Sequence, residues 1–125
     1  MSNANVTLEL IGAPTDVGAS VRGAGMGPDA LRVAGLPEAL ARQGYAVVDR
    51  GNLAGPATPW TQPPSGLRHL DEVIAWNRSV YEAIDTALGA GRVPLMMGGD
   101  HCLAIGSISA VAWHARKRGK KLRVL

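Results

Sequence analysis

Hydrophobic and polar positions along this chain follow two different periods, and the change from one to the other predicts alternating strands and helices. Three short runs are apolar or alternating and end at or just before glycine or proline: VTLELIGAP (6–14), YAVVDRG (45–51) and VPLMM (93–97). This pattern is typical of strands that end in loops. A last run, KLRVL (121–125), predicts the start of a fourth strand.

Two short helices are predicted between the first and second strands. The segment PDALRVAGL (28–36) opens with Pro28, a residue that suits the first position of a helix because its backbone is already in helical shape. The segment LPEALARQGY (36–45) repeats the device with Pro37 near its start and Gly44 just past its end.

A longer helix is predicted over 67–91, where apolar residues recur at steps of three and four. The residues of this apolar face are Leu70, Val73, Ile74, Asn77, Val80, Tyr81, Ile84 and Leu88. A further helix is predicted over 103–119, and its small residues allow close packing against a neighbour.

The order strand, helices, strand, helix, strand, helix, strand is typical of an α/β fold with a parallel sheet and crossover helices. One segment, from Gly51 to Gly66, contains so many prolines and glycines that it can form neither a helix nor a central strand. We interpret this segment as a surface excursion within a domain, with an interdomain linker as the alternative.

Composition narrows the classes of partner. The net charge is +3, but the one dense basic run, His114 to Lys121, has no aromatic platform beside it, so we expect no nucleic-acid partner. The single cysteine, Cys102, excludes an internal disulfide and indicates a reducing compartment, so we expect a cytoplasmic protein. We also expect no membrane partner, because no apolar run approaches the roughly 20 residues of a membrane helix.

Ligands of open parallel sheets bind beyond the carboxyl ends of the strands, and two loops of this sequence lie there. The first contains GASVRGAG (18–25), whose glycines allow a close backbone approach to a ligand. It lacks the Walker lysine and the dinucleotide spacing, so a nucleotide site stays an alternative that rests on this loop alone. Arg22 could hold an anion or tie the loop down, and Asp16 could face the site or form a turn.

The second loop is GGDH (98–101), directly after an apolar strand. Two glycines let the chain turn off the strand, so that Asp100 or His101 can point back into the crevice. Taken alone, a histidine in such a loop is more often a structural residue than a ligand. Cys102 follows at a predicted helix start, where the pKa of a thiol can fall, so a cysteine nucleophile is weighed against a buried small residue.

Four ring side chains on predicted helices are expected to be structural. His69 and His114 lie among polar neighbours and share no ligand spacing with another His, Cys or acid pair, so we expect both at the surface. Trp76 and Trp113 are expected to be packing residues.

Three segments taken in order resemble the arginases of the ureohydrolase superfamily: IGAPTDVGASVRGAGMGPDALRVAGL (11–36), VPLMMGGDHCLAIGSISA (93–110) and KKLRVL (120–125). The resemblance implies a three-layer α/β sandwich of which residues 1–125 are the N-terminal half. The chain would then be the N-terminal part of a single arginase-like domain whose C-terminal half is absent.

The resemblance also implies a function, the manganese-dependent hydrolysis of the guanidinium group of L-arginine to ornithine and urea. Family enzymes hold two manganese ions bridged by a hydroxide, and His101 corresponds to a ligand of one of them. Gly98, Gly99 and Asp100 would support that ligand. The segment GPDALRVAGL resembles arginases more than agmatinases, but an agmatinase-like or other guanidino hydrolase remains an alternative.

The other family ligands follow a strand like KLRVL, so we expect this chain alone to lack the binuclear site and to be inactive. A complementing C-terminal half or assembly into a homo-oligomer would supply the rest. A non-catalytic fragment that docks onto full-length ureohydrolase subunits is the alternative. In such a half sheet, central strands become edges, and we expect self-association and reduced cover over Val73, Val80 and Ile84.

Overall fold

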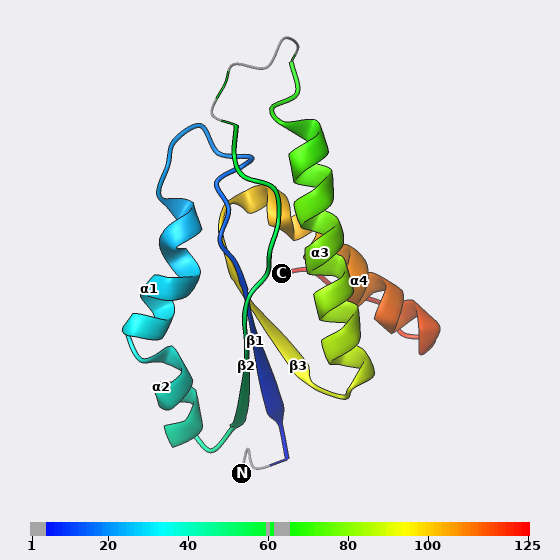
Figure 1. Cartoon of the computed structure of the whole chain (residues 1–125). Coiled ribbons are helices and arrows are strands. Elements are labelled where there is room, and N and C mark those ends of the chain that lie inside the picture. Colours follow the sequence, from blue (N-terminus) through cyan, green and yellow to red (C-terminus); the bar gives the residue numbers. More distant parts are fainter. Residues whose placement is uncertain (1–4, 60, 62–65) are drawn as a thin grey trace.

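The computed structural model describes residues 5–59, 61 and 66–125 of the chain. Figure 1 shows a sheet flanked by helices, with the chain running from a central strand outward to both sides. The elements in chain order are β1 (Thr7–Ala13), η1 (Ala24–Met26), α1 (Gly27–Val33), α2 (Leu36–Arg42), β2 (Ala46–Asn52), α3 (Leu70–Gly89), β3 (Val93–Gly98), η2 (His101–Leu103) and α4 (Ala104–Lys117).

The three strands form a parallel sheet in the order β2-β1-β3. Leu10 in the central strand lies opposite Asp49 of β2 and Leu95 of β3. Leu10 and Ile11 are fully buried and point to opposite faces, because successive side chains of a strand alternate. The predicted α/β class with a parallel sheet is confirmed.

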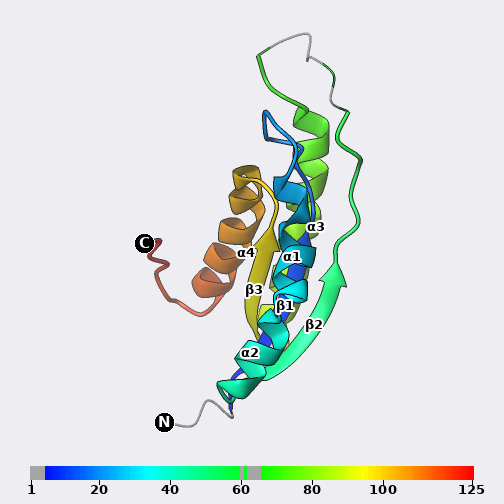
Figure 2. The same ribbon diagram turned by 90° about the vertical axis from the view of Figure 1, so that its left-hand side faces the viewer.

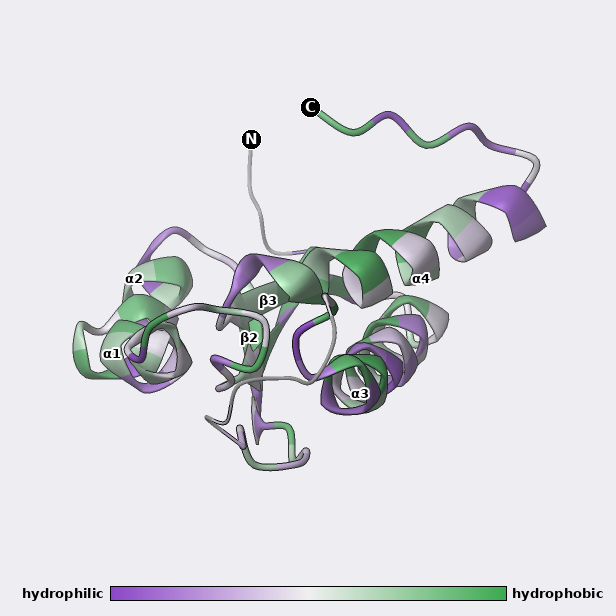
Figure 3. Ribbon diagram, turned by 90° about the horizontal axis from the view of Figure 1, so that it is seen from above, coloured by the Kyte–Doolittle hydropathy of each residue, from purple (hydrophilic) through white to green (hydrophobic). Residues whose placement is uncertain are grey.

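Helices cover both faces of the sheet. Figures 2 and 3 show α1 and α2 on one side and α3 and α4 on the other. The close approach of α3 and α4 depends on Gly106, whose N–H donates to Asn77 Oδ1 at 2.6 Å and whose missing side chain leaves room for the Asn77 backbone. The predicted close packing of the small-residue helix is therefore confirmed.

The predicted apolar face of α3 is confirmed along most of the helix, where Asn77, Val80 and Ile84 are buried. The prediction is wrong near the start of the helix, since Leu70 and Ile74 are each 47% exposed, and it omitted Trp76, which is buried. The expected loss of cover on this helix is also wrong for two residues, since Val80 is fully buried and Ile84 is 2% exposed. Contacts within this chain are enough to cover the middle of α3.

Two further predictions about ring residues are wrong. Trp113 is 46% exposed and packs its ring under Lys117 Nζ, 5.5 Å from the ring centroid, because it lies on the side of α4 that faces away from the sheet. His69 is buried at the residue before α3, in a left-handed backbone conformation with φ 47°. Trp76 packs in the core as predicted, and its indole Nε1 donates to Pro56 O at 2.9 Å.

Two further segments depart from the prediction, the C-terminal residues and the proline-rich segment. Residues 121–125 form no strand; they fold back beside α4, and residues 122–125 line a groove with Ile84 and Pro94. Their alternation favours a strand, but a strand also needs a neighbour to pair with. The proline-rich segment begins later than predicted, because Gly51 and Asn52 belong to β2. Residues 53–59 form neither helix nor strand, and residues 60 and 62–65 lie outside the described part of the chain.

A buried carboxylate in β1 pairs with a residue of β2 and with the residue just before β3. Glu9 is 3% exposed, and its two oxygens lie 3.3 Å from Arg50 Nη1 and 2.8 Å from Arg92 Nη1. A buried carboxylate is tolerated only when it is paired and hydrogen-bonded, and two guanidinium groups meet that need. No sequence pattern pointed to this cluster.

A second ion pair fastens α1 to β2. Arg32 donates from Nε and Nη2 to both oxygens of Asp49, at 2.8 and 2.9 Å, and from Nη1 to Asn52 Oδ1 at 2.6 Å. This pairing lowers the pKa of Asp49, chiefly through the hydrogen bond from Arg32. Helix α1 is thereby held against the edge strand β2.

Candidate functional site

The topology creates a switch point at the carboxyl ends of β1 and β3. After β1 the chain passes to the face covered by α1, and after β3 it passes to the face covered by α4 (Figure 3). The two connections leave in opposite directions, and the crevice between them is the common ligand site of open α/β sheets. Both loops singled out in the sequence, the one that contains GASVRGAG (18–25) and GGDH (98–101), follow these two strand ends.

Asp100 ties these two loops together. Its Oδ2 accepts a hydrogen bond from Gly18 N at 2.6 Å, and its Oδ1 accepts one from Cys102 N at 2.8 Å. Its own backbone N–H donates to Thr15 O at 3.1 Å. Asp100 is therefore the N-cap of η2 and also a bridge to the loop after β1, so it holds the backbone on both sides of His101.

Glycine is required at two places around this turn. A Cβ on Gly99 would lie 2.5 Å from Ala13 O and 2.7 Å from Thr15 O, closer than side-chain carbons come to backbone oxygens. A Cβ on Gly27 would lie 2.5 Å from Gly98 O. Gly98 itself meets only ordinary contacts, so the tight approach depends on Gly99 and on the start of α1.

The first loop uses its polar groups to hold its own shape. Asp16 accepts from Gly25 N at 2.6 Å through Oδ1, and its backbone oxygen accepts from Ala19 N at 2.9 Å, so Asp16 forms turns as one of its two predicted roles required. A phosphate loop would need free backbone N–H groups, yet those of Gly18 and Gly25 are donated to carboxylates. This arrangement disfavours the nucleotide alternative.

His101 begins η2 and is exposed at the carboxyl end of β3. It lines a shallow hollow together with Met96, Gly98, Gly99, Asp100 and Ala104. The backbone at His101 is held by the Asp100 bridge, while its side chain is exposed. An imidazole in this position can bind a ligand or a metal ion that approaches from that side.

Cys102, next to His101, does not have the character of a nucleophile. The thiol is half-buried, and burial, followed by the nearby Asp100, raises the pKa of Cys102 to about 12. The thiol is therefore protonated at neutral pH, whereas a nucleophilic cysteine acts as the thiolate. The structure favours the alternative of a small packing residue.

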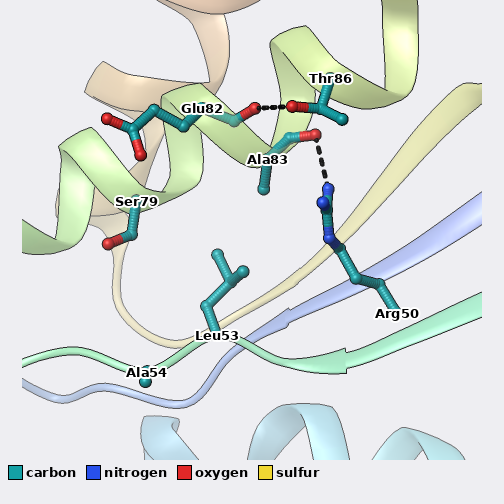
Figure 4. A pocket seen from close by; sticks show the side chains of 7 residues that line it. All are labelled: Arg50, Leu53, Ala54, Ser79, Glu82, Ala83 and Thr86. Atoms are coloured by element: carbon teal, nitrogen blue, oxygen red, sulfur yellow. Dashed lines mark hydrogen bonds between the residues drawn. The ribbon is translucent and has the colours of Figure 1, made fainter. Parts of the chain in front are cut away.

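A second hollow lies beside the outer strand, between β2 and α3 (Figure 4). Arg50 reaches into it and donates from Nη1 to Ala83 O at 3.1 Å, and Thr86 Oγ1 donates to Glu82 O at 2.7 Å. Since Arg50 also pairs with the buried Glu9, its guanidinium group is used to hold β2 against β1 and α3. We assign these polar groups to the fold.

Whether this chain can hold a pair of metal ions depends on how many side chains could act as ligands at one place. Within residues 5–59, 61 and 66–125, no group of three or more His, Cys, Asp or Glu side chains could hold a metal ion. Both oxygens of Asp100, the residue before His101, accept backbone N–H bonds, so this carboxylate serves to hold the turn. The described residues by themselves do not fit a binuclear manganese site.

Among the described residues, no helix has the length and apolar character required to cross a bilayer.

Sequence reasoning missed the partners that shape this site. Thr15 and Gly18 reach Asp100 across the switch point, 82 residues away in the case of Gly18. The only available signal was the placement of both loops after strands, which predicts their proximity but not the individual hydrogen bonds.

Comparison with known proteins gives a consistent result. The model of the family described as "Arginase family" matches residues 6–125. The arginase of Brevibacillus brevis is 36% identical over 115 residues, which cover 92% of this chain and 39% of that protein. The arginase of Bacillus caldovelox is 40% identical over 114 residues, covering 90% of this chain and 38% of that protein.

Solved structures agree. The native structure of Bacillus caldovelox arginase matches with a TM-score of 0.80 and 37% identity, over 87% of this chain and 37% of that one. A hypothetical agmatinase from Burkholderia thailandensis, at 24% identity and a TM-score of 0.63, shares the fold. This chain thus spans only between 37% and 39% of the length of curated arginases that it matches.

Proposed function

Because this chain belongs to the arginase family, we propose that residues 1–125 form the N-terminal part of a single domain that hydrolyses the guanidinium group of L-arginine to ornithine and urea. The observation that carries the proposal is the turn from Gly98 to His101, which presents an exposed imidazole at the switch point of the sheet. Agmatinase-like or other guanidino substrates are the alternatives within the superfamily.

In this proposal the metal is manganese and His101 supplies one of its ligands. Asp100 positions that ligand through its bonds to Gly18 and Cys102, and Gly99 permits the close approach of the turn to β1. Manganese favours carboxylate and water ligands with some imidazole, so the missing ligands should be mostly carboxylates. They would come from a complementing C-terminal half or from another subunit of a homo-oligomer, in the cytoplasm.

The residues of this chain have a limited role in the reaction. His101 binds and orients, and the turn around it sets the position of one edge of the active site. Hydrolysis of a guanidinium group needs an activated water, and bound divalent metals supply that activation in hydrolases. Since the described residues do not complete such a site, no chemical step is assigned to them.

Urea release from L-arginine with added manganese tests the proposal directly. We expect the 125-residue chain alone to release no urea and to retain no stoichiometric manganese. We expect both to appear when the chain is combined with a polypeptide that supplies the remaining ligands, and to disappear with His101→Ala. Release from agmatine but not from L-arginine would overturn the substrate assignment.

The control is a variant that leaves the turn intact, and Val33→Ala serves because Val33 is 90% exposed on α1. Metal content and urea are measured on the same samples. Urea release by the chain alone would show that our account of the missing ligands is wrong. Binding to ureohydrolase subunits without turnover would favour the non-catalytic alternative.

A further inference from the structure

The loop after β1 holds the turn of His101 on both sides, through a short segment that begins at Thr15. Thr15 O accepts a hydrogen bond from Asp100 N at 3.1 Å, and Gly18 N donates to Asp100 Oδ2 at 2.6 Å. Gly18 also packs against Cys102, since a Cβ on Gly18 would lie 2.9 Å from Cys102 Cβ. The segment therefore contacts the residue before His101 and the residue after it, while His101 itself is exposed.

The shape of this segment depends on the side chain of Thr15. Its Oγ1 accepts a hydrogen bond from Val17 N at 3.1 Å, so the hydroxyl closes a turn of the kind that threonine forms with a backbone N–H two residues later. Thr15 is 4% exposed and Val17 is fully buried. Without the hydroxyl, the Val17 N–H would lose its partner in a buried place, and the backbone would have to move to satisfy it.

The backbone of Thr15 is confined as well. Thr15 N donates to Ala13 O at 2.9 Å, which turns the chain directly after β1. A Cβ on Gly99 would lie 2.7 Å from Thr15 O, so the turn after β3 packs closely against this carbonyl. A movement of Thr15 would therefore shift its own bond to Asp100 and also the N–H of Gly18, three residues later.

We propose that Thr15 is a positioning residue for His101 that acts through Asp100. Its hydroxyl sets the turn, the turn places the carbonyl of Thr15 and the N–H of Gly18, and these two groups fix Asp100 beside the imidazole. Functional groups must be held within about half an ångström of their productive place, and a loop needs supporting bonds of this kind to do so. The inference rests on the proposed function in one respect, since that function gives the imidazole a role in binding.

Asp16, the neighbour of Thr15, holds a different part of the loop. Its Oδ1 accepts a hydrogen bond from Gly25 N at 2.6 Å, so it fastens the loop toward η1 and α1. The two residues can therefore be told apart within one loop. Asp16→Ala should speed amide exchange at Gly25, whereas loss of the Thr15 hydroxyl should speed exchange at Gly18 and Asp100.

Amide exchange on the 125-residue chain tests the positioning step without metal or substrate. Thr15→Val keeps the shape of the side chain and removes the hydroxyl, and we expect exchange at Gly18 and Asp100 to become about tenfold faster, relative to amides of β1. Thr15→Ser keeps the hydroxyl and should restore most of the protection. Thr86→Val, the same chemical change at a threonine that donates to Glu82 O on α3, should leave both amides unchanged.

A measurement on the unaltered chain needs no variant. The amides of Val17, Gly18 and Asp100 should open as one unit, with the same dependence of exchange on low denaturant concentration. Separate openings of Val17 and Asp100 would contradict the proposal, even if Thr15→Val failed to fold.

The complex with a complementing polypeptide, one that supplies the remaining ligands, gives the functional readout. We expect Thr15→Val to lower kcat for urea release about tenfold per folded complex, because a small misplacement of a group in the site is costly, and we expect Thr15→Ser to recover it. Glu9→Gln weakens the fold away from this turn, so it should lower stability and leave kcat of the folded complex unchanged. A purely structural role for Thr15 would make the two residues behave alike.

Two further results would overturn the proposal. One is exchange at Gly18 and Asp100 that is no faster in Thr15→Val than in Thr86→Val, and the other is faster exchange together with an unchanged kcat. If the unaltered complex releases no urea, the proposed function fails, while faster exchange in Thr15→Val and its recovery in Thr15→Ser would still support the positioning of the turn. The two can therefore fail separately.

Discussion

The Glu9 cluster and the His101 turn use charged and ionisable side chains in opposite ways. Glu9 is buried early in the central strand, and its partners Arg50 and Arg92 come from this chain, at 3.3 and 2.8 Å. His101 lies just beyond the carboxyl end of β3 and is exposed, on a backbone that Asp100 holds in place. The difference indicates that the buried Glu9 charge is used to hold the sheet together, whereas the exposed imidazole of His101 remains accessible to a ligand.

Glu9→Gln should produce the largest change in stability. The substitution removes the negative charge between two guanidinium groups, so it breaks a buried ion pair from one side, and we expect a loss of about 2 to 3 kcal/mol in the free energy of unfolding. Urea denaturation followed by circular dichroism measures this. Glu82→Gln, at an exposed glutamate on α3, is the matched control and should change stability by less than about 0.5 kcal/mol. Equal effects would contradict the role of the cluster.

Asp100→Ala should have an intermediate effect. It removes the cap of η2 and the bridge to Gly18, and we expect a loss of about 1 to 2 kcal/mol together with faster amide exchange at Gly18 and Cys102. Asp100→Asn should retain part of both, since the amide oxygen can still accept one bond. Unchanged exchange at Gly18 in Asp100→Ala would show that the bridge does not hold the loop.

The pH dependence of stability and of thiol reactivity at Cys102 tests how firmly the turn beside His101 is packed. Burial and Asp100 raise the pKa of Cys102 from 9.0 to about 12 in the folded protein, so the folded state favours the protonated thiol. The resulting stability is fully present below about pH 9 and is lost as pH rises toward about 12. Alkylation by iodoacetamide at pH 8 should be much slower in the folded chain than in urea. Equal rates would contradict the raised pKa.

His101→Ala should have the smallest effect on stability, less than about 0.5 kcal/mol, because an exposed side chain is removed while the Asp100 bridge remains. The same variant should abolish manganese retention in the complex with the complementing polypeptide. The pairing of these two measurements decides whether His101 belongs to the chemistry or to the fold. A loss of stability as large as that of Glu9→Gln would place it with the fold.

Sequence reasoning succeeded where the signal lies within a few neighbouring residues. The periodicity of 67–91 predicted α3, the run VPLMM predicted β3, and the glycines after it placed the turn of His101 at a strand end. It failed where a residue's surroundings decide. Leu70 and Trp113 are exposed and His69 is buried because the orientation of each helix depends on what it packs against.

What the sequence by itself determined is the order of elements, the parallel α/β class, and the position of His101 after β3, because turn chemistry and hydrophobic period are local properties. Only the tertiary structure decided that Asp100 would bridge to Gly18 and that Glu9 would meet Arg92, since these partners are 82 and 83 residues apart. Such contacts depend on the register of strands and the approach of loops, which the folded sheet sets as a whole.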